Sequence, residues 1–103
     1  MKKKVFLDRN AKKELDHFSE NVKVEFEAYF EILKNEGRLT LPEAKKVTKD
    51  LFELRVKIGG EYRGFYAYIG KMYIIILHFF KKTTQKTPIK NIKTAKRRLD
   101  KYE

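Results

Sequence analysis

The chain has 103 residues, with 25 Lys and Arg against 14 Asp and Glu, no Cys, and a formal net charge of +11. The length fits one domain over residues 1–103 with a modest core, and the absence of cysteine excludes a disulfide scaffold and a thiolate metal site. The basic charge favours nucleic acid, an acidic membrane surface or an acidic protein as a partner, although charge also serves plain solubility.

The charge is unevenly distributed along the chain. Residues 81–103 carry nine Lys and Arg against two carboxylates, whereas residues 20–36 carry five Glu against two Lys. The first apolar run, Val5-Phe6-Leu7, is too short for a secretory signal, and no stretch approaches the ~20 apolar residues of a membrane span. We therefore expect a cytoplasmic protein with one basic end and no membrane partner.

The first part of the chain predicts a strand followed by two helices. Residues 4–7 are expected to form a short strand, and the Asp8 carboxylate can cap a helix by accepting from free backbone amides. A second helix is expected to start after a new cap at Ser19 and to end at Gly37. The apolar positions at helical spacing are Ala11, Leu15 and Phe18 in the first helix, and Val22, Phe26, Tyr29, Phe30 and Leu33 in the second. The two helices predict a hairpin with an acidic outer face.

The middle of the chain changes from a loop to a predicted β-hairpin. Residues 38–50 are ambiguous, and Pro42-Glu43-Ala44 favours a loop that contains a short helical turn. Apolar residues then alternate with charged ones, which predicts a half-buried strand over residues 51–57. Gly59-Gly60 is typical of a tight hairpin turn, and residues 61–69 return as a strand rich in Tyr and Phe.

The last part of the chain predicts the most hydrophobic strand and a basic helix. After a turn at Gly70-Lys71, residues 72–80 are expected to form a central strand. Thr87 and Pro88 fit the cap and the first position of a final helix. The apolar positions of that helix are Ile89, Ile92, Ala95 or Lys96, Leu99 and Tyr102. The resulting plan is βααβββα, an α+β domain with helices packed against a mostly antiparallel sheet.

A cationic loop links the last strand to the last helix. Three lysines, three threonines and a glutamine occupy residues 81–87, and such side chains suit an anion, above all phosphate, better than a core. Arg55 and Lys57 alternate with the core positions of their strand, and Arg63 follows the Gly-Gly turn close by. With Lys82 and Lys86 they would gather at one end of the sheet, where they repel one another unless an anion binds. The alternative is a solvated face that two carboxylates neutralise, Glu53 and Glu61.

The two histidines differ in their surroundings. His78 lies in the apolar strand shortly before the lysine-rich loop, where its side chain could reach a phosphate. A histidine in such a strand is more often a hydrogen-bonded structural residue. His17, near the end of the first helix, is expected on the surface or paired with the helix dipole. No zinc-ligand spacing joins the two, so no metal and no cofactor are expected.

Aromatic residues are enriched in the two strands predicted over residues 61–69 and 72–80. Aromatics interleaved with arginines can stack unpaired bases, although aromatics in strands also simply fill cores. Tyr66 is the candidate for such a role because it shares a strand with Arg63. The two are three positions apart, so strict alternation places them on opposite faces unless a bulge or twist brings them to one site.

Familiar catalytic motifs are absent from the sequence. It contains no G-x-S-x-G elbow, no P-loop and no G-x-G-x-x-G, and its carboxylates cluster away from the basic end. A nuclease built from these residues would work without metal, with the RNA 2′-hydroxyl attacking the adjacent phosphate. Such a site needs a proton acceptor, a proton donor and two or more cationic groups.

Four blocks of sequence stand out, and the last two are the most specific: Leu51–Val56, Glu61–Tyr66, Ile76–Phe80 and Thr84–Pro88. Together they resemble the RelE/HigB superfamily of toxins from bacterial toxin–antitoxin pairs, in its phage-related HigB-like branch. The resemblance covers most of the chain, because the first strand and the helical hairpin also match in order and length. Gly64 departs from the aliphatic residue more usual at its position.

This resemblance implies a RelE-like fold, with the helical hairpin on a mostly antiparallel four-stranded sheet and a C-terminal basic helix. It implies an mRNA endoribonuclease acting on the ribosome, and a cognate antitoxin, often a helix-turn-helix protein. By family analogy, phosphate contact and acid–base catalysis are expected of Arg55, Arg63, Tyr66, His78, Lys82 and Lys86. Further RNA contacts are expected of Lys57, Lys81, Gln85, Arg97 and Arg98.

Two other functions stay open at this point. A ParE-like toxin that inhibits DNA gyrase through protein contact would have the same fold, so fold alone does not decide. A nucleic-acid-binding domain without catalysis would keep salt-dependent binding and show no cleavage. The cationic cluster favours RNA cleavage over gyrase binding.

Overall fold

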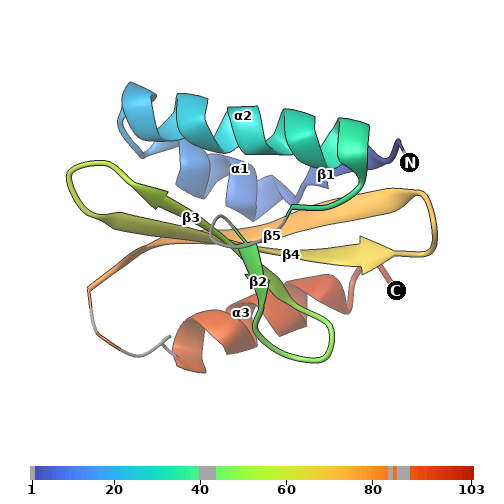
Figure 1. The fold of residues 1–103 in the computed structure, drawn as a ribbon. Helices are drawn as coiled ribbons and strands as arrows, with labels where there is room; N and C mark the ends of the chain where they lie inside the picture. The colour runs from blue at the N-terminus through green and yellow to red at the C-terminus, as the bar shows by residue number, and fades with distance from the viewer. Residues whose placement is uncertain (1, 40–43, 84, 86–88) are drawn as a thin grey trace.

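One five-stranded sheet lies between two layers of helices. The computed structural model describes residues 2–39, 44–83, 85 and 89–103. Its elements in chain order are β1 (Lys4–Leu7), α1 (Arg9–Asp16), α2 (Glu20–Glu36), β2 (Ala44–Lys46), β3 (Phe52–Lys57), β4 (Glu61–Ile69), β5 (Tyr73–Lys82) and α3 (Ile89–Leu99). Helices α1 and α2 cover one face of the sheet and α3 covers the other (Figure 1).

The strand order is β1-β5-β4-β3-β2, with β1 parallel to β5 and the other neighbours antiparallel. The expected α+β class and the mostly antiparallel sheet are therefore confirmed. The hydrophobic strand β5 is an interior strand, as expected, with β1 on one side and β4 on the other. No helix within the described ranges is both long enough and apolar enough to cross a bilayer.

The sheet has five strands rather than the expected four. The additional strand β2 pairs antiparallel with β3, from Ala44 opposite Leu54 to Lys46 opposite Phe52. Only Ala44 of its three residues is buried, so the strand lacks the alternating pattern by which strands are predicted. Ala44 was expected in a short helical turn and instead begins this strand. The other two residues of that expected turn, Pro42 and Glu43, lie outside the described residues. So do Thr87 and Pro88, the expected start of the last helix.

The helix ends follow the expected capping residues with one difference. The Asp8 carboxylate accepts from the backbone N–H of Asn10 at 2.9 Å and of Ala11 at 3.1 Å, which caps α1. Ser19 stands at the start of α2 but its hydroxyl makes no capping hydrogen bond. Gly37 ends α2 in the left-handed region at φ 80°, where glycine carries no Cβ penalty.

Each face of the sheet has its own hydrophobic core. On the side of α1 and α2 the buried residues include Leu15, Phe26, Leu54, Tyr66, Ile76 and Phe79. On the side of α3 they include Leu51, Phe65, Leu77, Phe80, Ala95 and Leu99. Because both faces are covered, β5 is apolar along nearly its whole length rather than alternating.

Gly64 makes room for an aromatic ring in the first of these cores. It lies opposite Phe79 in the β4–β5 pair, and a Cβ built on it would approach the Phe79 ring to 2.9 Å. Phe79 in turn packs edge-to-face on Phe26 of α2, with ring centroids 4.9 Å apart. The Phe79 ring fills the space that an aliphatic side chain at position 64 would take.

Candidate functional site

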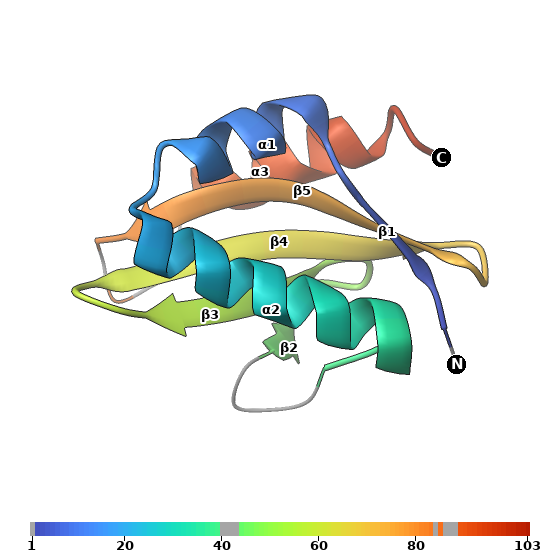
Figure 2. The ribbon, with the colours of Figure 1, turned by 90° about the horizontal axis from the view of Figure 1, so that it is seen from above.

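The turn between β3 and β4 and the C-terminal end of β5 lie at the same end of the sheet (Figures 1 and 2). The register aligns Arg55 with Arg63 and Lys57 with Glu61 across β3 and β4. Across β4 and β5 it aligns Glu61 with Lys82. The basic residues of three strands therefore gather at this end, as the sequence predicts.

A chain of alternating charges runs through this end of the sheet. The Oε1 atom of Glu53 accepts from Arg63 Nη1 at 2.6 Å and from Arg55 Nε at 3.2 Å. Arg63 also pairs through Nη2 with Glu61 at 3.0 Å. The side chains of Glu53 and Arg63 are 0% and 3% exposed, while that of Arg55 is 27% exposed. Arg63 is thus a buried, doubly paired cation, and Arg55 keeps part of its surface open to solvent.

The pairing changes the ionisation of the groups involved. Burial would lower the pKa of Arg63, but hydrogen bonds to Glu53 and Glu61 outweigh it and raise that pKa. The hydrogen bond from Arg63 lowers the pKa of Glu61, and nearby lysines lower it further. Both groups are therefore charged at neutral pH. The two carboxylates do neutralise part of the basic face, as the alternative reading of the sequence had it, but they act mainly on Arg63.

An open pocket of about 440 Å³ lies beside this chain of charges. Among the described residues it is lined by Glu61, Lys82, Thr83 and Gln85. Lys57 borders the same region, 3.9 Å from Glu61, and is largely exposed. The ammonium group of Lys81 instead lies over the ring of Tyr62, 5.6 Å from its centroid. Lys86, expected in the same site, falls outside the described residues.

Arg63 and Tyr66 lie on opposite faces of the sheet. An irregularity in β5 does exist beside them, since Phe65 aligns with His78 but Tyr66 aligns with Ile76. It does not bring the two side chains together, because Tyr66 packs on the ring of Phe52 in the core under α2. Tyr66 is 1% exposed, and burial, with the neighbouring Tyr68, raises its pKa. The structure places Tyr66 in the core and away from the cations.

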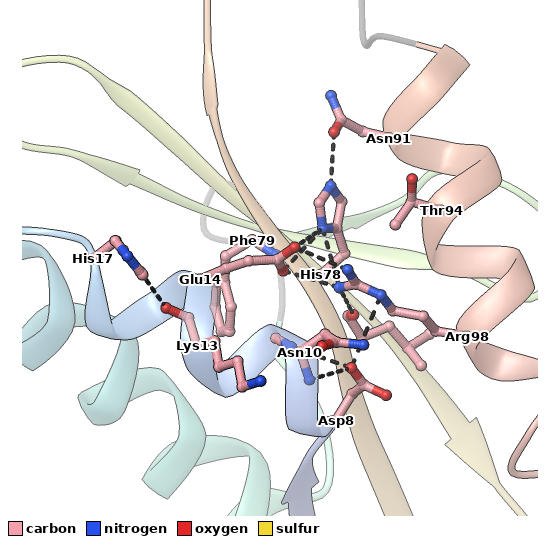
Figure 3. A network of polar contacts seen from close by, with 12 residues as sticks. Asp8, Asn10, Lys13, Glu14, His17, His78, Phe79, Asn91, Thr94 and Arg98 are labelled. Atoms are coloured by element: carbon pink, nitrogen blue, oxygen red, sulfur yellow. Dashed lines mark hydrogen bonds and ion pairs between the residues drawn. The ribbon is translucent and has the colours of Figure 1, made fainter.

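His78 is held inside a polar network at the edge of β5 (Figure 3). Its Nδ1 atom lies 2.9 Å from Glu14 Oε1, and its Nε2 atom lies 2.7 Å from Asn91 Oδ1. Its ring stacks on Phe80, with centroids 5.5 Å apart. Both ring nitrogens are therefore engaged within the protein, by α1 on one side and by α3 on the other.

Glu14 is the centre of that network. It accepts two hydrogen bonds of 3.0 Å from Arg98 and one of 3.1 Å from the Phe79 backbone N–H. Burial would raise the pKa of Glu14, but the hydrogen bonds from His78, Arg98 and Phe79 outweigh it and lower that pKa to about 2. A carboxylate therefore stays charged here through the physiological range.

Arg98 extends the network toward the start of α1. Its Nη1 atom also donates to the Leu77 carbonyl at 2.9 Å, and its Nε lies 3.9 Å from Asp8. The Tyr102 hydroxyl donates to Asp8 at 2.7 Å. Of the two arginines expected to contact RNA from α3, Arg97 is exposed and Arg98 is used to attach the helix to the body of the protein.

Sequence reasoning did not identify Glu14 or Asn91 as partners of the candidate residues, and it considered Glu53 only as a carboxylate that neutralises a solvated face. Glu14 looks like one more carboxylate of an amphipathic helix, and Glu53 like the polar member of an alternating strand. The exposed His17 is as expected, with its Nδ1 2.7 Å from the Lys13 carbonyl. Within the part of the chain that the structure describes, no three His, Asp or Glu side chains gather as metal ligands would.

Comparisons with known proteins agree with this fold. The family described as phage-derived protein Gp49-like (DUF891) matches residues 13–100. A double mutant of the Escherichia coli toxin RelE in the free state is similar with a TM-score of 0.70 and 13% identity, covering 100% of both chains. Comparison with curated protein sequences gives no match.

Two further similar structures are complexes that contain RelE. RelE in the intact E. coli RelBE complex has a TM-score of 0.63 and 17% identity, covering 78% of this chain and 96% of that one. The archaeal RelE–RelB complex from Pyrococcus horikoshii has a TM-score of 0.56 and 23% identity, covering 79% of this chain and 96% of that one. The resemblance stated from the sequence is thereby confirmed. The chain belongs to the Gp49-like family of phage-derived proteins and has the fold of the RelE toxins.

Proposed function

We propose that this chain is the toxin of a toxin–antitoxin pair and an mRNA endoribonuclease that works in the cytoplasm, on the ribosome and without metal. The observation that carries the proposal is the group of accessible cations, Arg55, Lys57 and Lys82, beside an open pocket at one end of a RelE-like sheet. Two of the similar RelE structures are bound to RelB antitoxins. By that analogy the partner is a cognate antitoxin, for which we propose a helix-turn-helix protein.

The reaction is a transesterification within the RNA chain. The ribose 2′-oxygen attacks the adjacent phosphorus while the bond from phosphorus to the 5′-oxygen breaks, which leaves a 2′,3′-cyclic phosphate and a 5′-hydroxyl. Negative charge builds on the phosphoryl oxygens, and Arg55 and Lys82 would stabilise it. Glu61 is the carboxylate in the pocket and would accept the 2′-hydroxyl proton, while the Lys82 ammonium would supply the proton to the 5′-oxygen.

The other residues expected in the site have different roles in this proposal. Arg63 is enclosed by two carboxylates and would act through its neighbours rather than on RNA. Tyr66 and His78 would support packing. RNA contact outside the pocket would come from the lysine-rich loop with Lys81 and Gln85, and from the exposed basic face of α3, including Arg97. Such contacts are mostly to phosphates and are therefore sensitive to salt.

One observation favours a second candidate, an RNA-binding domain without catalysis. Two of the expected acid–base groups are not available to a substrate, because Tyr66 is buried and both ring nitrogens of His78 are engaged. If Glu61 is unable to serve as the proton acceptor, the same cations would bind RNA and leave it intact.

Induced expression in a bacterial host tests the proposal, with mapping of mRNA 5′ ends in the wild type and in Arg55→Ala. Lys71→Ala is the matched control, because Lys71 is an exposed lysine in the turn at the other end of β4 and β5. We expect growth arrest and new 5′-hydroxyl ends within translated reading frames in the wild type and the control, and neither in Arg55→Ala.

Other outcomes point elsewhere. Growth arrest with intact mRNA would reject RNA cleavage and direct attention to gyrase and other protein targets. RNA binding by the purified protein without cleavage would support the domain without catalysis.

Arg63→Ala is a poor test variant, because it would leave the buried Glu53 carboxylate without its main counter-ion and so confuse loss of folding with loss of activity.

A further inference from the structure

The buried carboxylate of Glu53 joins two arginines that face each other across the β3–β4 pair. Arg55 and Arg63 occupy directly opposite positions, an arrangement that is destabilising for like charges. Glu53 Oε1 accepts from both guanidinium groups, at 3.2 Å from Arg55 and 2.6 Å from Arg63. Glu53 therefore offsets the repulsion between them and holds each at a fixed distance.

The contact with Glu53 leaves the terminal nitrogens of Arg55 available to bind an anion. The contact uses the Nε atom of Arg55, and the terminal nitrogens of this 27%-exposed side chain make no hydrogen bond or ion pair within the described residues. A guanidinium whose Nε is fixed presents its two terminal nitrogens as an oriented fork, the geometry suited to two oxygens of a phosphate. Arg55 is thus held ready for a phosphate without being neutralised by a direct pair at its exposed end.

Arg63 differs from Arg55 because its terminal nitrogens are paired and its side chain is buried. Its Nη1 and Nη2 atoms are occupied by Glu53 and Glu61, and its side chain is 3% exposed. Its Nε and the Oε2 atom of Glu53 are buried without a hydrogen-bond partner in the described structure. Burying the Glu53 carboxylate would be very unfavourable without this counter-ion. Arg63 therefore acts as the buried counter-ion of Glu53 and does not face the solvent.

We infer that Glu53 is a positioning residue for RNA binding, which fixes the guanidinium of Arg55 toward a phosphate, and that Arg63 is the buried counter-ion of Glu53 rather than a ligand of the RNA. The inference rests on the proposed function, because it assigns roles within the same site. It gives different roles to two arginines that look equivalent in the sequence. Arg55 contacts the RNA, whereas Arg63 stabilises Glu53, the residue that orients Arg55.

Substitution of Glu53 by Gln distinguishes positioning from simple attraction, because the two predict opposite signs. Glu53→Gln makes the site more positive by one charge, so attraction alone would tighten RNA binding. Positioning predicts weaker binding, since a neutral amide holds Arg55 less firmly than a carboxylate. Loss of a hydrogen bond to a charged group corresponds to about a tenfold weaker affinity or more.

The experiment measures binding of a fluorescent, single-stranded 2′-O-methyl RNA, which cannot be cleaved, by fluorescence anisotropy. The matched control is Asp50→Asn, which removes the same charge from an exposed residue outside the proposed site. We expect about tenfold weaker binding for Glu53→Gln and equal or tighter binding for Asp50→Asn. Equal or tighter binding for Glu53→Gln, in a variant that unfolds cooperatively, would overturn the inference.

The role of Arg63 is tested with the double variant Glu53→Gln, Arg63→Gln. If Arg63 only supports Glu53, the double variant binds RNA as Glu53→Gln does. A further loss of about tenfold on adding Arg63→Gln would show that Arg63 contacts the RNA and would overturn this part. Should Glu53→Gln fail to fold, Glu53→Asp keeps the buried charge but withdraws it from Arg55, and the same weakening is expected.

Failure of the inference and of the proposed function can be told apart with Arg55→Ala. If the wild type binds the RNA no better than Arg55→Ala, the proposed site is wrong and the inference falls with it. If Arg55→Ala weakens binding but Glu53→Gln and Glu53→Asp do not, the site stands and only the positioning role is rejected.

Discussion

The Nδ1 atom of His78 lies 2.9 Å from the Glu14 carboxylate, which joins β5 to a helix 64 positions earlier in the chain. Arg98 reaches the same carboxylate from α3, on the other face of the sheet (Figure 3). One carboxylate thus connects the two helical layers at the edge of β5. The histidine that looks like a catalytic candidate in the sequence is part of this structural connection.

Acid should weaken this connection in a defined pH range. The pKa of Glu14 is lowered from 4.5 to about 2 in the folded protein. A carboxylate with a lowered folded pKa stabilises the protein above its unfolded pKa, so the contribution is complete above about pH 4.5 and is lost as the pH falls toward 2. We expect Glu14→Gln to remove on the order of 1–2 kcal/mol at pH 7, after allowing for solvent screening of a partly exposed group.

Urea unfolding at pH 7, 5, 4 and 3 measures this effect. The free energy of unfolding should fall more steeply with acid in the wild type than in Glu14→Gln. Glu31→Gln, which changes an exposed carboxylate of α2, is the control and should follow the wild type. Parallel curves for wild type and Glu14→Gln would contradict the assignment of the lowered pKa to this network.

The adjacent arginines of α3 should respond differently to substitution. Arg98→Met removes the hydrogen bonds to Glu14 and the Leu77 carbonyl, and should lower the free energy of unfolding by about 3 kcal/mol because it leaves the Glu14 carboxylate partly unpaired. Arg97→Met should change stability by no more than about 0.5 kcal/mol. Chemical unfolding of both variants checks the pair, and equal effects would mean that Arg98 does not anchor the helix.

Lys82 should contribute to RNA affinity in a salt-dependent way. Lys82→Ala should weaken binding of a single-stranded RNA and reduce the slope of log K against log salt concentration by about 0.7 in magnitude, the value for one phosphate contact to a single strand. Lys71→Ala, at the opposite end of the sheet, should leave the slope unchanged. A titration series between low and moderate salt measures both, and identical slopes for Lys82→Ala and wild type would remove Lys82 from the binding site.

Gly64 should tolerate a side chain poorly. A Cβ at this position meets the Phe79 ring at 2.9 Å, and the backbone there is in a strand rather than a flexible turn. Gly64→Val should therefore destabilise the protein by about 1–3 kcal/mol through overpacking. Thermal unfolding checks this, and the double variant Gly64→Val, Phe79→Leu should recover part of the loss. No recovery would place the strain elsewhere.

Tyr66→Phe separates a core role from a catalytic one. The Tyr66 ring packs on Phe52 at 5.5 Å between centroids and is almost completely buried. Removing only its hydroxyl should preserve the proposed RNA cleavage within about twofold, because general acid–base groups typically contribute 100-fold or more. A loss of that size in Tyr66→Phe, with unchanged unfolding, would restore Tyr66 as a catalytic residue.

Much of the fold could be predicted because its determinants are local. Apolar spacing identified α1, α2 and the strands of the β3–β4 hairpin, and the Asp8 cap and the Gly59-Gly60 turn were placed correctly. The strand β2 escaped prediction because it is three residues long and mostly exposed, so its identity depends on pairing with β3 rather than on its own pattern.

The candidate site was predictable only in part. Alternation along β3 correctly placed Arg55 away from the core that contains Leu54, and the register brings Arg55, Lys57, Arg63 and Lys82 to one end of the sheet. The alternation pattern gives no indication that Arg63 is buried and Arg55 accessible. That difference arises because the Glu53 side chain is buried between them in the folded protein.

The order of helices and strands other than β2, and the basic end, can be predicted from the sequence because they follow from spacings of a few residues and from composition. The family was indicated by the resemblance of four sequence blocks. Which candidates face solvent depends on the tertiary structure. Tyr66 is in the core, His78 is fixed by Glu14 and Asn91, and Arg98 crosses 84 positions of sequence to reach Glu14. Burial and charge pairing depend on which distant side chains pack together, and that is settled only when the sheet and both helical layers assemble.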